Sequence, residues 1–175
     1  PNDFRAYNNL GELAFAAGDA AKAESYFKQA ASKNANAPEV NANLGLCELV
    51  KGNVAAAESY LGKATGANAA NEALGNLYIK QGQYDRAVNA FGDAKTNSAA
   101  QAQILAKDYN KAKATLSAIK NPDAMTDYLM AIVGARTNNA SLVSSSIKSA
   151  IAKDASMAQR AANDREFAKF ADSIK

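Results

Sequence analysis

The sequence contains no histidine and no tryptophan, and its only cysteine is Cys47. Histidine is the commonest general base and the commonest metal ligand, so its absence argues against catalysis and against the usual zinc site. A single cysteine cannot form an internal disulfide. We therefore predict a protein that is not an enzyme, has no metal or cofactor, and holds Cys47 as a small packed side chain that alkylates slowly.

Long apolar runs and charge clusters are also missing. The longest apolar stretch, residues 129–135, is far shorter than the roughly 18–20 residues that cross a bilayer. Lys and Arg number 20 against 17 Asp and Glu, a net charge of +3, and the charges are interspersed along the chain. This pattern predicts a chain that does not span a membrane and gives no sign of nucleic-acid binding. The carboxylates expected singly on solvated helix faces are Glu24, Glu48, Glu58 and Glu72.

Alanine is abundant, and a Leu-Gly pair returns along the chain. Alanine is the best helix former and permits close packing of helices, which predicts an all-α protein. The pairs beginning at Leu10, Leu44 and Leu74 are 34 and 30 residues apart. Self-similarity at a fixed period of this size indicates a repeat architecture rather than one compact fold.

Each residue type that recurs with the Leu-Gly pair has a packing role. Tyr7 and Leu10 lie three residues apart on one helix face, and Gly11 lets a second helix approach closely. Gly18 suits the left-handed conformation that ends a helix, and Phe27 belongs to a buried stripe on the returning helix. The recurring positions are Tyr7, Leu10, Gly11, Gly18, Ala23, Phe27 and Ala30, then Leu44, Gly45, Gly52, Ala57, Leu61 and Ala64, then Leu74, Gly75, Tyr78, Gly82, Ala87, Phe91 and Ala94.

These three units resemble the tetratricopeptide repeat (TPR), with its Leu-Gly pair, aromatic, turn glycine, alanine, aromatic and alanine. The resemblance implies an all-α fold, a right-handed superhelix of antiparallel helical hairpins that forms an α-solenoid with a C-terminal capping helix. The expected repeats within residues 1–155 are 4–36, 38–66, 68–96, and two degenerate units at 97–121 and 123–153, with the cap at 156–175.

The last two units depart from the pattern. In the fourth, Ala99-Ala100 replaces the Leu-Gly pair and Lys107 stands where the turn glycine belongs, so we expect a short, weakly specified first helix. In the fifth, Asn138 takes the turn position, and asparagine is the next best residue for a left-handed turn.

Both ends of the chain carry further expectations. The tail has Phe167, Phe170 and Ile174 at helical spacing, and Asp164 is a candidate N-cap that we expect to face water together with Arg165. The chain opens at Pro1 without a methionine, at what resembles an inter-repeat linker. We therefore expect the native protein to have residues before Pro1.

The resemblance places peptide ligands on the inner face formed by the first helix of every hairpin. Asparagines there can donate to and accept from a peptide backbone, and the aliphatic residues can supply apolar pockets. For those aliphatic residues the alternative is packing against the adjacent hairpin. The candidate partner-binding residues are Arg5, Asn8, Glu12, Phe15, Asn43, Leu46, Leu49, Asn76, Ile79 and Lys80.

Some TPR proteins grip a C-terminal carboxylate with a basic cluster. The matching positions here are Asn8, Glu12, Asn43, Ala69 and Ala73. Only Asn43 fits and Glu12 would repel such a ligand, so this specificity is disfavoured.

The sequence thus predicts a non-catalytic protein–protein interaction module or scaffold that binds a protein segment in the TPR groove. The alternative is a structural spacer or oligomerisation arm of a bacterial cell-envelope protein with an unoccupied groove, since richness in alanine, asparagine and serine is typical of bacterial envelope or periplasmic proteins. Capture of a glycan or small molecule ranks last because no exposed aromatic platform is evident. The oligomeric state and the partner stay open.

Overall fold

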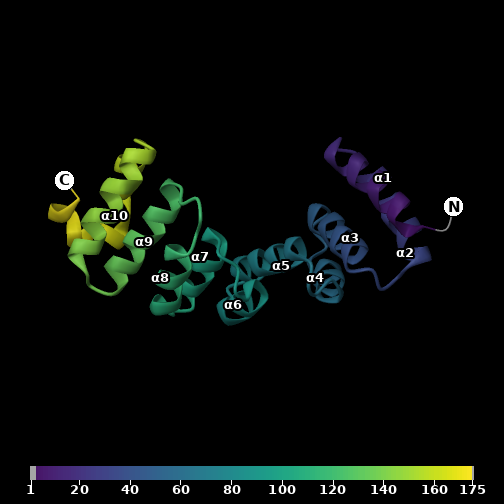
Figure 1. The fold of residues 1–175 in the computed structure, drawn as a ribbon, viewed down its shortest axis with the longest axis horizontal. Helices are drawn as coiled ribbons and strands as arrows, with labels where there is room; N and C mark the ends of the chain where they lie inside the picture. Colours follow the sequence, from purple (N-terminus) through teal and green to yellow (C-terminus); the bar gives the residue numbers. More distant parts are fainter. Residues whose placement is uncertain (1–2, 175) are drawn as a thin grey trace. The chain divides into compact units, whose positions relative to one another are not determined.

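The computed structural model describes residues 3–174, and these form helices joined by short turns, with no strand among them. They follow one another in the order shown in Figure 1. The α-helices are α1 (Phe4–Ala16), α2 (Ala20–Lys33), α3 (Pro38–Val50), α4 (Val54–Lys63), α5 (Asn68–Lys80), α6 (Tyr84–Phe91), α7 (Asn97–Leu105), α8 (Tyr109–Ser117), α9 (Ala124–Arg136), α10 (Ala140–Lys153) and α11 (Met157–Asn163), followed by the 3-10 helix η1 (Arg165–Ser173).

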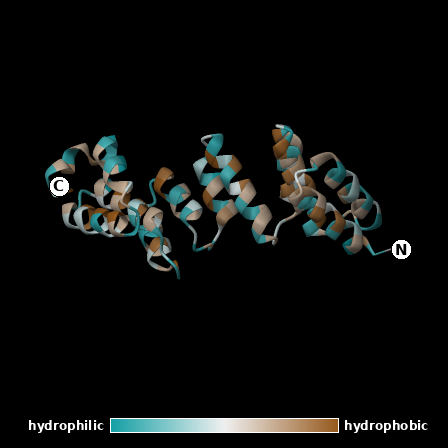
Figure 2. Cartoon of the chain, turned by 90° about the horizontal axis from the view of Figure 1, so that it is seen from above, coloured by the Kyte–Doolittle hydropathy of each residue, from teal (hydrophilic) through white to brown (hydrophobic). Residues whose placement is uncertain are grey.

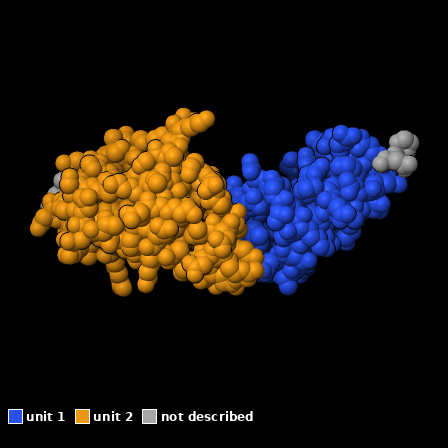
Figure 3. Space-filling view, turned by 60° about the horizontal axis from the view of Figure 1, so that its bottom comes forward, with its two compact units in different colours: residues 1–77 blue, residues 78–175 orange. Residues whose placement is uncertain are grey.

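The chain divides into two compact units, residues 1–77 and residues 78–175 (Figure 3). In the first unit α1 packs against α2 and α3 against α4, and in the second α7 packs against α8 and α9 against α10. Each helix carries both hydrophilic and hydrophobic residues along its length (Figure 2). Pairing of this kind buries the apolar side of each helix against its neighbours.

Short polar side chains begin most of the helices. Asp19 accepts from the backbone N–H of Lys22 at 3.0 Å, and Asp108 accepts from that of Lys111 at 3.1 Å. Such caps satisfy N–H groups that have no partner inside the helix. At α9 the cap is reciprocal, because the Asp123 side chain accepts from Thr126 and the Thr126 hydroxyl accepts from the Asp123 backbone.

A single residue in the left-handed region lies in each of five turns between consecutive helices. The φ angle is 82° at Gly18 and 56° at Asn138, so both turn predictions are confirmed. Lys107 also adopts φ 64°, a conformation that a side chain bearing a Cβ disfavours. The other turn glycines of this kind are Gly52 (79°) and Gly82 (72°). The helix before Lys107 is short, as expected, at 9 residues.

Glycine and a bulky residue interlock at the centre of each hairpin in the first unit. Phe27 is 1% exposed and lies against Gly11, where even a methyl group would collide with its ring. Leu61, also 1% exposed, fills the corresponding place against Gly45. The prediction that these glycines permit close helix packing is confirmed.

Replacing Gly45 with leucine is expected to destabilise the first unit by about 1–3 kcal/mol through overpacking. A Cβ at this position would lie 2.7 Å from Leu61 Cγ and 3.3 Å from the Leu61 backbone nitrogen, so the neighbour cannot simply rotate away. Gly62 is the matched control, since it lies in α4 with no atom within 4 Å of an added Cβ. Gly62→Ala should raise stability by about 0.5–1 kcal/mol. Urea unfolding of both variants tests this, and equal effects would contradict the packing described.

One core expectation is wrong. Leu10 is 43% exposed, whereas its counterpart Leu44 is 4% exposed and packs in the cluster that contains Phe27. The physical reason is that Leu44 is covered by the preceding hairpin, while no helix among residues 3–174 covers Leu10. Leu13, one turn further along α1, is 69% exposed.

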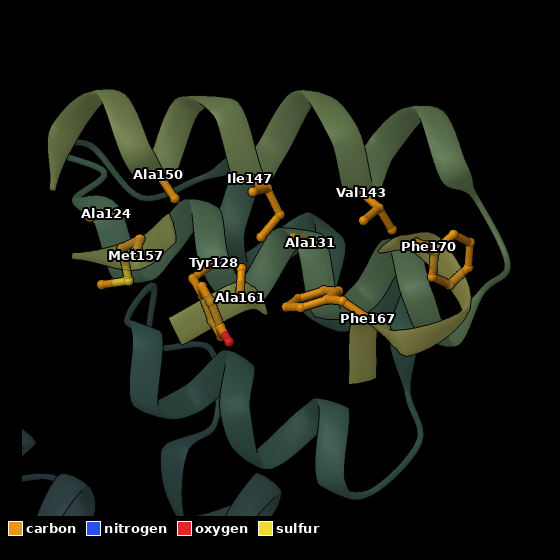
Figure 4. Packing of buried hydrophobic residues seen from close by; sticks show 10 residues of the cluster. All are labelled: Ala124, Tyr128, Ala131, Val143, Ile147, Ala150, Met157, Ala161, Phe167 and Phe170. Atoms are coloured by element: carbon orange, nitrogen blue, oxygen red, sulfur yellow. The ribbon is translucent and has the colours of Figure 1, made fainter. Parts of the chain in front are cut away.

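The second unit ends in a core built from α9, α10 and the C-terminal segment. Figure 4 shows ten of its side chains, with Tyr128 and Phe167 near its centre. Their rings meet edge to face, with centroids 5.5 Å apart and an interplanar angle of 86°. The members are Ala124, Tyr128, Ala131, Val143, Ile147, Ala150, Met157, Ala161, Phe167 and Phe170.

Polar contacts tie this C-terminal segment to α9. Asp164 caps η1 by accepting from the Glu166 backbone, which confirms the predicted N-cap. Its other carboxylate oxygen accepts from the Tyr128 hydroxyl at 2.6 Å, so Asp164 does not simply face water as expected. Arg136 forms two hydrogen bonds with the Glu166 carboxylate. The predicted amphipathic tail is thus a short α-helix followed by a 3-10 helix, packed on α9 and α10.

Candidate functional site

The first helices of the two hairpins in the first unit lie side by side, because α1 contacts α3 directly. Seven candidate residues lie on these two helices: Arg5, Asn8, Glu12, Phe15, Asn43, Leu46 and Leu49. Asn76 lies in α5, also in the first unit, whereas Ile79 and Lys80 belong to the second unit. The site is therefore built from α1 and α3.

Three polar side chains join α1 to α3 in what we call the amide–carboxylate network, formed by Asn8, Glu12 and Asn43. The Glu12 carboxylate oxygen Oε1 accepts from Asn8 Nδ2 at 2.8 Å and from Asn43 Nδ2 at 3.1 Å. Asn43 Nδ2 also donates to Asn8 Oδ1 at 3.0 Å. Asn8 is only 5% exposed and its amide joins the two helices, so contact of this amide with a peptide backbone stays a prediction.

A cavity of about 130 Å³ opens beside this network, and we call it the α1–α3 cavity. Its lining consists of Phe27 of α2, apolar side chains on α1 and α3, and two residues of the network, Glu12 and Asn43. Sequence reasoning found four of the lining residues and missed Ala16, one turn after Glu12, and Phe27, which it assigned to the core alone. The lining residues are Glu12, Phe15, Ala16, Phe27, Asn43 and Leu46.

Besides Asn8, two candidate residues on α1 and α3 do not line the α1–α3 cavity. Leu49 packs with the cluster that contains Leu61 and Ala70, which supports the alternative of hairpin-to-hairpin packing at this position. Arg5 lies in the first turn of α1, where its Nε donates to Asp3 Oδ1 at 3.0 Å. The exposed Arg5 guanidinium is thus paired with the residue that caps its own helix.

An ion network connects the end of α3 to α2. Lys51 Nζ lies 3.1 Å from Glu24 Oε1 and 2.5 Å from Glu48 Oε1. Asn53 donates to the second Glu48 oxygen at 2.8 Å. The prediction that Glu24 and Glu48 lie on solvated faces is therefore wrong, because their side chains are only 17% and 11% exposed and their carboxylates share one lysine.

Acid is expected to destabilise the first unit through this network. Hydrogen bonds from Lys28 and Lys51 hold the pKa of Glu24 below its usual value, and Lys51 and Asn53 lower the pKa of Glu48 in the same way. A carboxylate whose pKa is depressed by folding stabilises the protein above its unfolded pKa, and this contribution is lost as pH falls through the folded value. The loss should begin near pH 4.3, the usual glutamate pKa, and continue below it.

Thermal unfolding between pH 7 and pH 3 measures this loss. Lys51→Gln should flatten the dependence of Tm on pH in this range, because it removes the shared cation. Lys22→Gln is the control, since Lys22 is an exposed lysine of α2 outside the network. Identical pH profiles for the two variants would contradict the role of Lys51.

The part of the chain that the structure describes contains no group of three or more His, Cys, Asp or Glu placed to hold a metal ion. Its helices are all too short or too polar to cross a membrane. Cys47 is 2% exposed, which confirms the prediction of a packed thiol, and burial raises its pKa. Slow alkylation of Cys47 stays a prediction.

Comparison with protein families bears directly on these hairpins. One model described as tetratricopeptide repeat matches residues 14–78, and a second with the same description matches residues 69–99. Residues 14–99 of this chain belong to the tetratricopeptide repeat family. The matches begin at residue 14, so they include α2, α3 and α4 but only the last turn of α1, and Glu12 lies outside them. Assignment of residues 97–121 and 123–153 to two further, degenerate TPR units stays a prediction.

Solved structures show the same fold. A tetratricopeptide repeat protein from Parabacteroides merdae is 17% identical in sequence and superposes with a TM-score of 0.76. The alignment covers 99% of this chain and 77% of the Parabacteroides chain. PilW, a widely conserved type IV pilus biogenesis factor, is 21% identical with a TM-score of 0.67, and the alignment covers 97% of this chain and 83% of PilW. A thermophilic TPR protein from Thermus thermophilus is 15% identical with a TM-score of 0.54, and the alignment covers 90% of this chain and 96% of the Thermus chain. Comparison with curated proteins gave no match.

These findings confirm the predicted family and the TPR α-solenoid fold. TPR proteins are generally non-catalytic scaffolds that bind other proteins. The partner of this TPR protein and the residues that contact it belong to the proposals below.

Proposed function

We propose that this TPR protein binds a segment of another protein in the α1–α3 cavity and performs no reaction there. The observation that supports this most directly is the cavity itself, which lies between the first helices of two TPR hairpins and combines apolar walls with a polar edge. Binding sites commonly join a hydrophobic pocket to a few placed polar groups in this way. A segment docked there would bury Leu46 and Phe15, which are now only partly covered.

Selection of binders from a random twelve-residue peptide library, displayed and panned against the whole chain, tests the proposal. Selected peptides are then titrated against the wild-type protein and the groove variant Asn43→Ala/Leu46→Asp by fluorescence anisotropy. We expect the groove variant to weaken binding at least about tenfold, because it places an uncompensated charge in an apolar pocket. Circular dichroism confirms that the variant folds.

The matched control carries the same kinds of change on α2. Ser25 and Gln29 are exposed on that helix and line no part of the α1–α3 cavity, so Ser25→Asp/Gln29→Ala should leave the affinity unchanged. Peptides that bind both variants equally well, or a selection that yields no cavity-dependent peptide, would overturn the proposal.

The alternative is a spacer or oligomerisation arm of a bacterial cell-envelope protein whose groove is empty. The likeness in fold to PilW, a pilus biogenesis factor, is the observation that favours an envelope setting. Under this alternative the groove variant binds and assembles as the wild type does, and light scattering shows self-association at micromolar concentration. A monomer under those conditions would count against it.

A further inference from the structure

The amide–carboxylate network presents acceptors, rather than donors, to a ligand. Both Nδ2 hydrogens of Asn43 are used within the network, one toward Glu12 Oε1 and one toward Asn8 Oδ1. Asn8 Nδ2 also donates to Glu12. The groups left over at the edge of the cavity are Glu12 Oε2 and Asn43 Oδ1, and both are acceptors.

The orientation of the Asn43 amide follows from its surroundings. Turning the amide by 180° would bring Asn43 Oδ1 against Glu12 Oε1 and Asn8 Oδ1, two other acceptors, and would replace two hydrogen bonds with two repulsions. The network thus decides which atom of the Asn43 amide is left without a hydrogen-bond partner, namely the carbonyl oxygen Oδ1.

Glu12 carries a negative charge that the described part of the chain leaves unpaired. Its side chain forms hydrogen bonds to two neutral amides, and no Lys or Arg among residues 3–174 forms an ion pair with it. Phe15, Phe27 and Leu46 lie beside it around the cavity. A single negative charge at the rim of an apolar cavity complements one kind of side chain, a cation at the end of an aliphatic stem.

We propose that the α1–α3 cavity selects a protein segment that carries a lysine or arginine. The aliphatic stem lies against Phe15 and Leu46, and the cationic head donates to Glu12 Oε2 and Asn43 Oδ1. This inference rests on the proposed function and adds the partner's chemistry to it. Arginine matches the site best, because its planar guanidinium can donate to two oxygens at once.

Peptide pools provide the test. Acetylated and amidated octapeptide pools, each with one residue type fixed at a central position and the other positions randomised, are titrated against the whole chain. Pools with fixed arginine or lysine should bind about three- to tenfold more tightly than pools with fixed glutamate. The preference should weaken as salt rises from about 0.1 M to about 1 M, where the screening length falls from about 10 Å to about 3 Å.

Three variants separate the inference from the proposed function. Glu12→Gln keeps the size of the side chain and should abolish the preference for cationic pools while leaving apolar pools bound. Glu12→Lys should reverse the preference toward fixed glutamate. The control Glu39→Gln removes one negative charge from an exposed position in the first turn of α3, outside the cavity, and should leave the preference intact.

Each outcome has a distinct meaning. Binding that depends on Leu46 but shows no cationic preference, or a preference that Glu12→Gln leaves unchanged, would overturn this inference and leave the proposed function standing. Pools with fixed leucine that bind the groove variant Asn43→Ala/Leu46→Asp as well as they bind the wild type would overturn both. Equal loss of preference in Glu12→Gln and Glu39→Gln would show that net charge alone is being measured, and would also overturn the inference.

Discussion

Phe27→Ala is expected to lower the free energy of unfolding of the first unit by about 3–5 kcal/mol. The ring is 1% exposed, closes against Gly11, and belongs to the cluster that joins α1, α2 and α3 through Ala14, Val40 and Leu44. Truncation would leave a cavity that the rigid helix contacts cannot fill. The loss should appear in chemical unfolding and as faster amide hydrogen exchange in α1 to α3.

Phe27→Leu is the matched control, since it keeps most of the apolar volume and should cost clearly less than the alanine variant. Because the chain has two compact units, the two units can unfold in separate transitions. Hydrogen exchange measures protection residue by residue and so assigns the loss of stability to the first unit. Unchanged stability in Phe27→Ala would show that this residue is not the centre of the hairpin core.

Phe167→Ala is expected to have an effect of the same size, about 3–5 kcal/mol, at the C-terminal end of the second unit. Phe167 is 1% exposed and meets the Tyr128 ring edge to face. Its loss also loosens the segment that carries Asp164, the acceptor of the Tyr128 hydroxyl. We expect faster hydrogen exchange in α9, α10 and the C-terminal segment.

Lys169→Ala provides the control in the same segment. Lys169 is exposed and donates to Asn138 Oδ1 at 2.8 Å, a surface contact expected to contribute little. If Phe167→Ala and Lys169→Ala gave the same exchange pattern, the C-terminal segment would not be held by its aromatic side chain.

The local features of the hairpins could be predicted because each depends on one residue and its near neighbours. A left-handed turn needs glycine or asparagine, which located Gly18 and Asn138. The small-to-large pairing of Gly45 with Leu61 follows from the repeated spacing in the same manner. The cap at Asp164 is equally local.

Contacts between hairpins could not be predicted, because they depend on which helix lies beside which face. The Leu10 side chain has the same sequence signature as Leu44 and differs only in having no hairpin before it among the described residues. The ion network around Lys51 joins positions 24, 48 and 51, and nothing in their spacing reveals the shared cation.

The candidate site shows the same division. Glu12, Phe15, Asn43 and Leu46 were found because first-helix positions in this family face a common wall, and the structure brings them together around one cavity. What the sequence did not reveal is that the Asn8 amide is buried and hydrogen-bonded to Glu12 and Asn43. That internal bonding decides that the site presents acceptors.

The footprint of a bound peptide on the backbone amide NMR spectrum tests the central claim most directly. A peptide selected from the random library is titrated into isotopically labelled protein. Binding in the α1–α3 cavity predicts that the largest shift changes fall in α1 and α3, at and around Glu12, Phe15, Asn43 and Leu46. Changes confined to the second helices α2 and α4, or to the second unit, would contradict it.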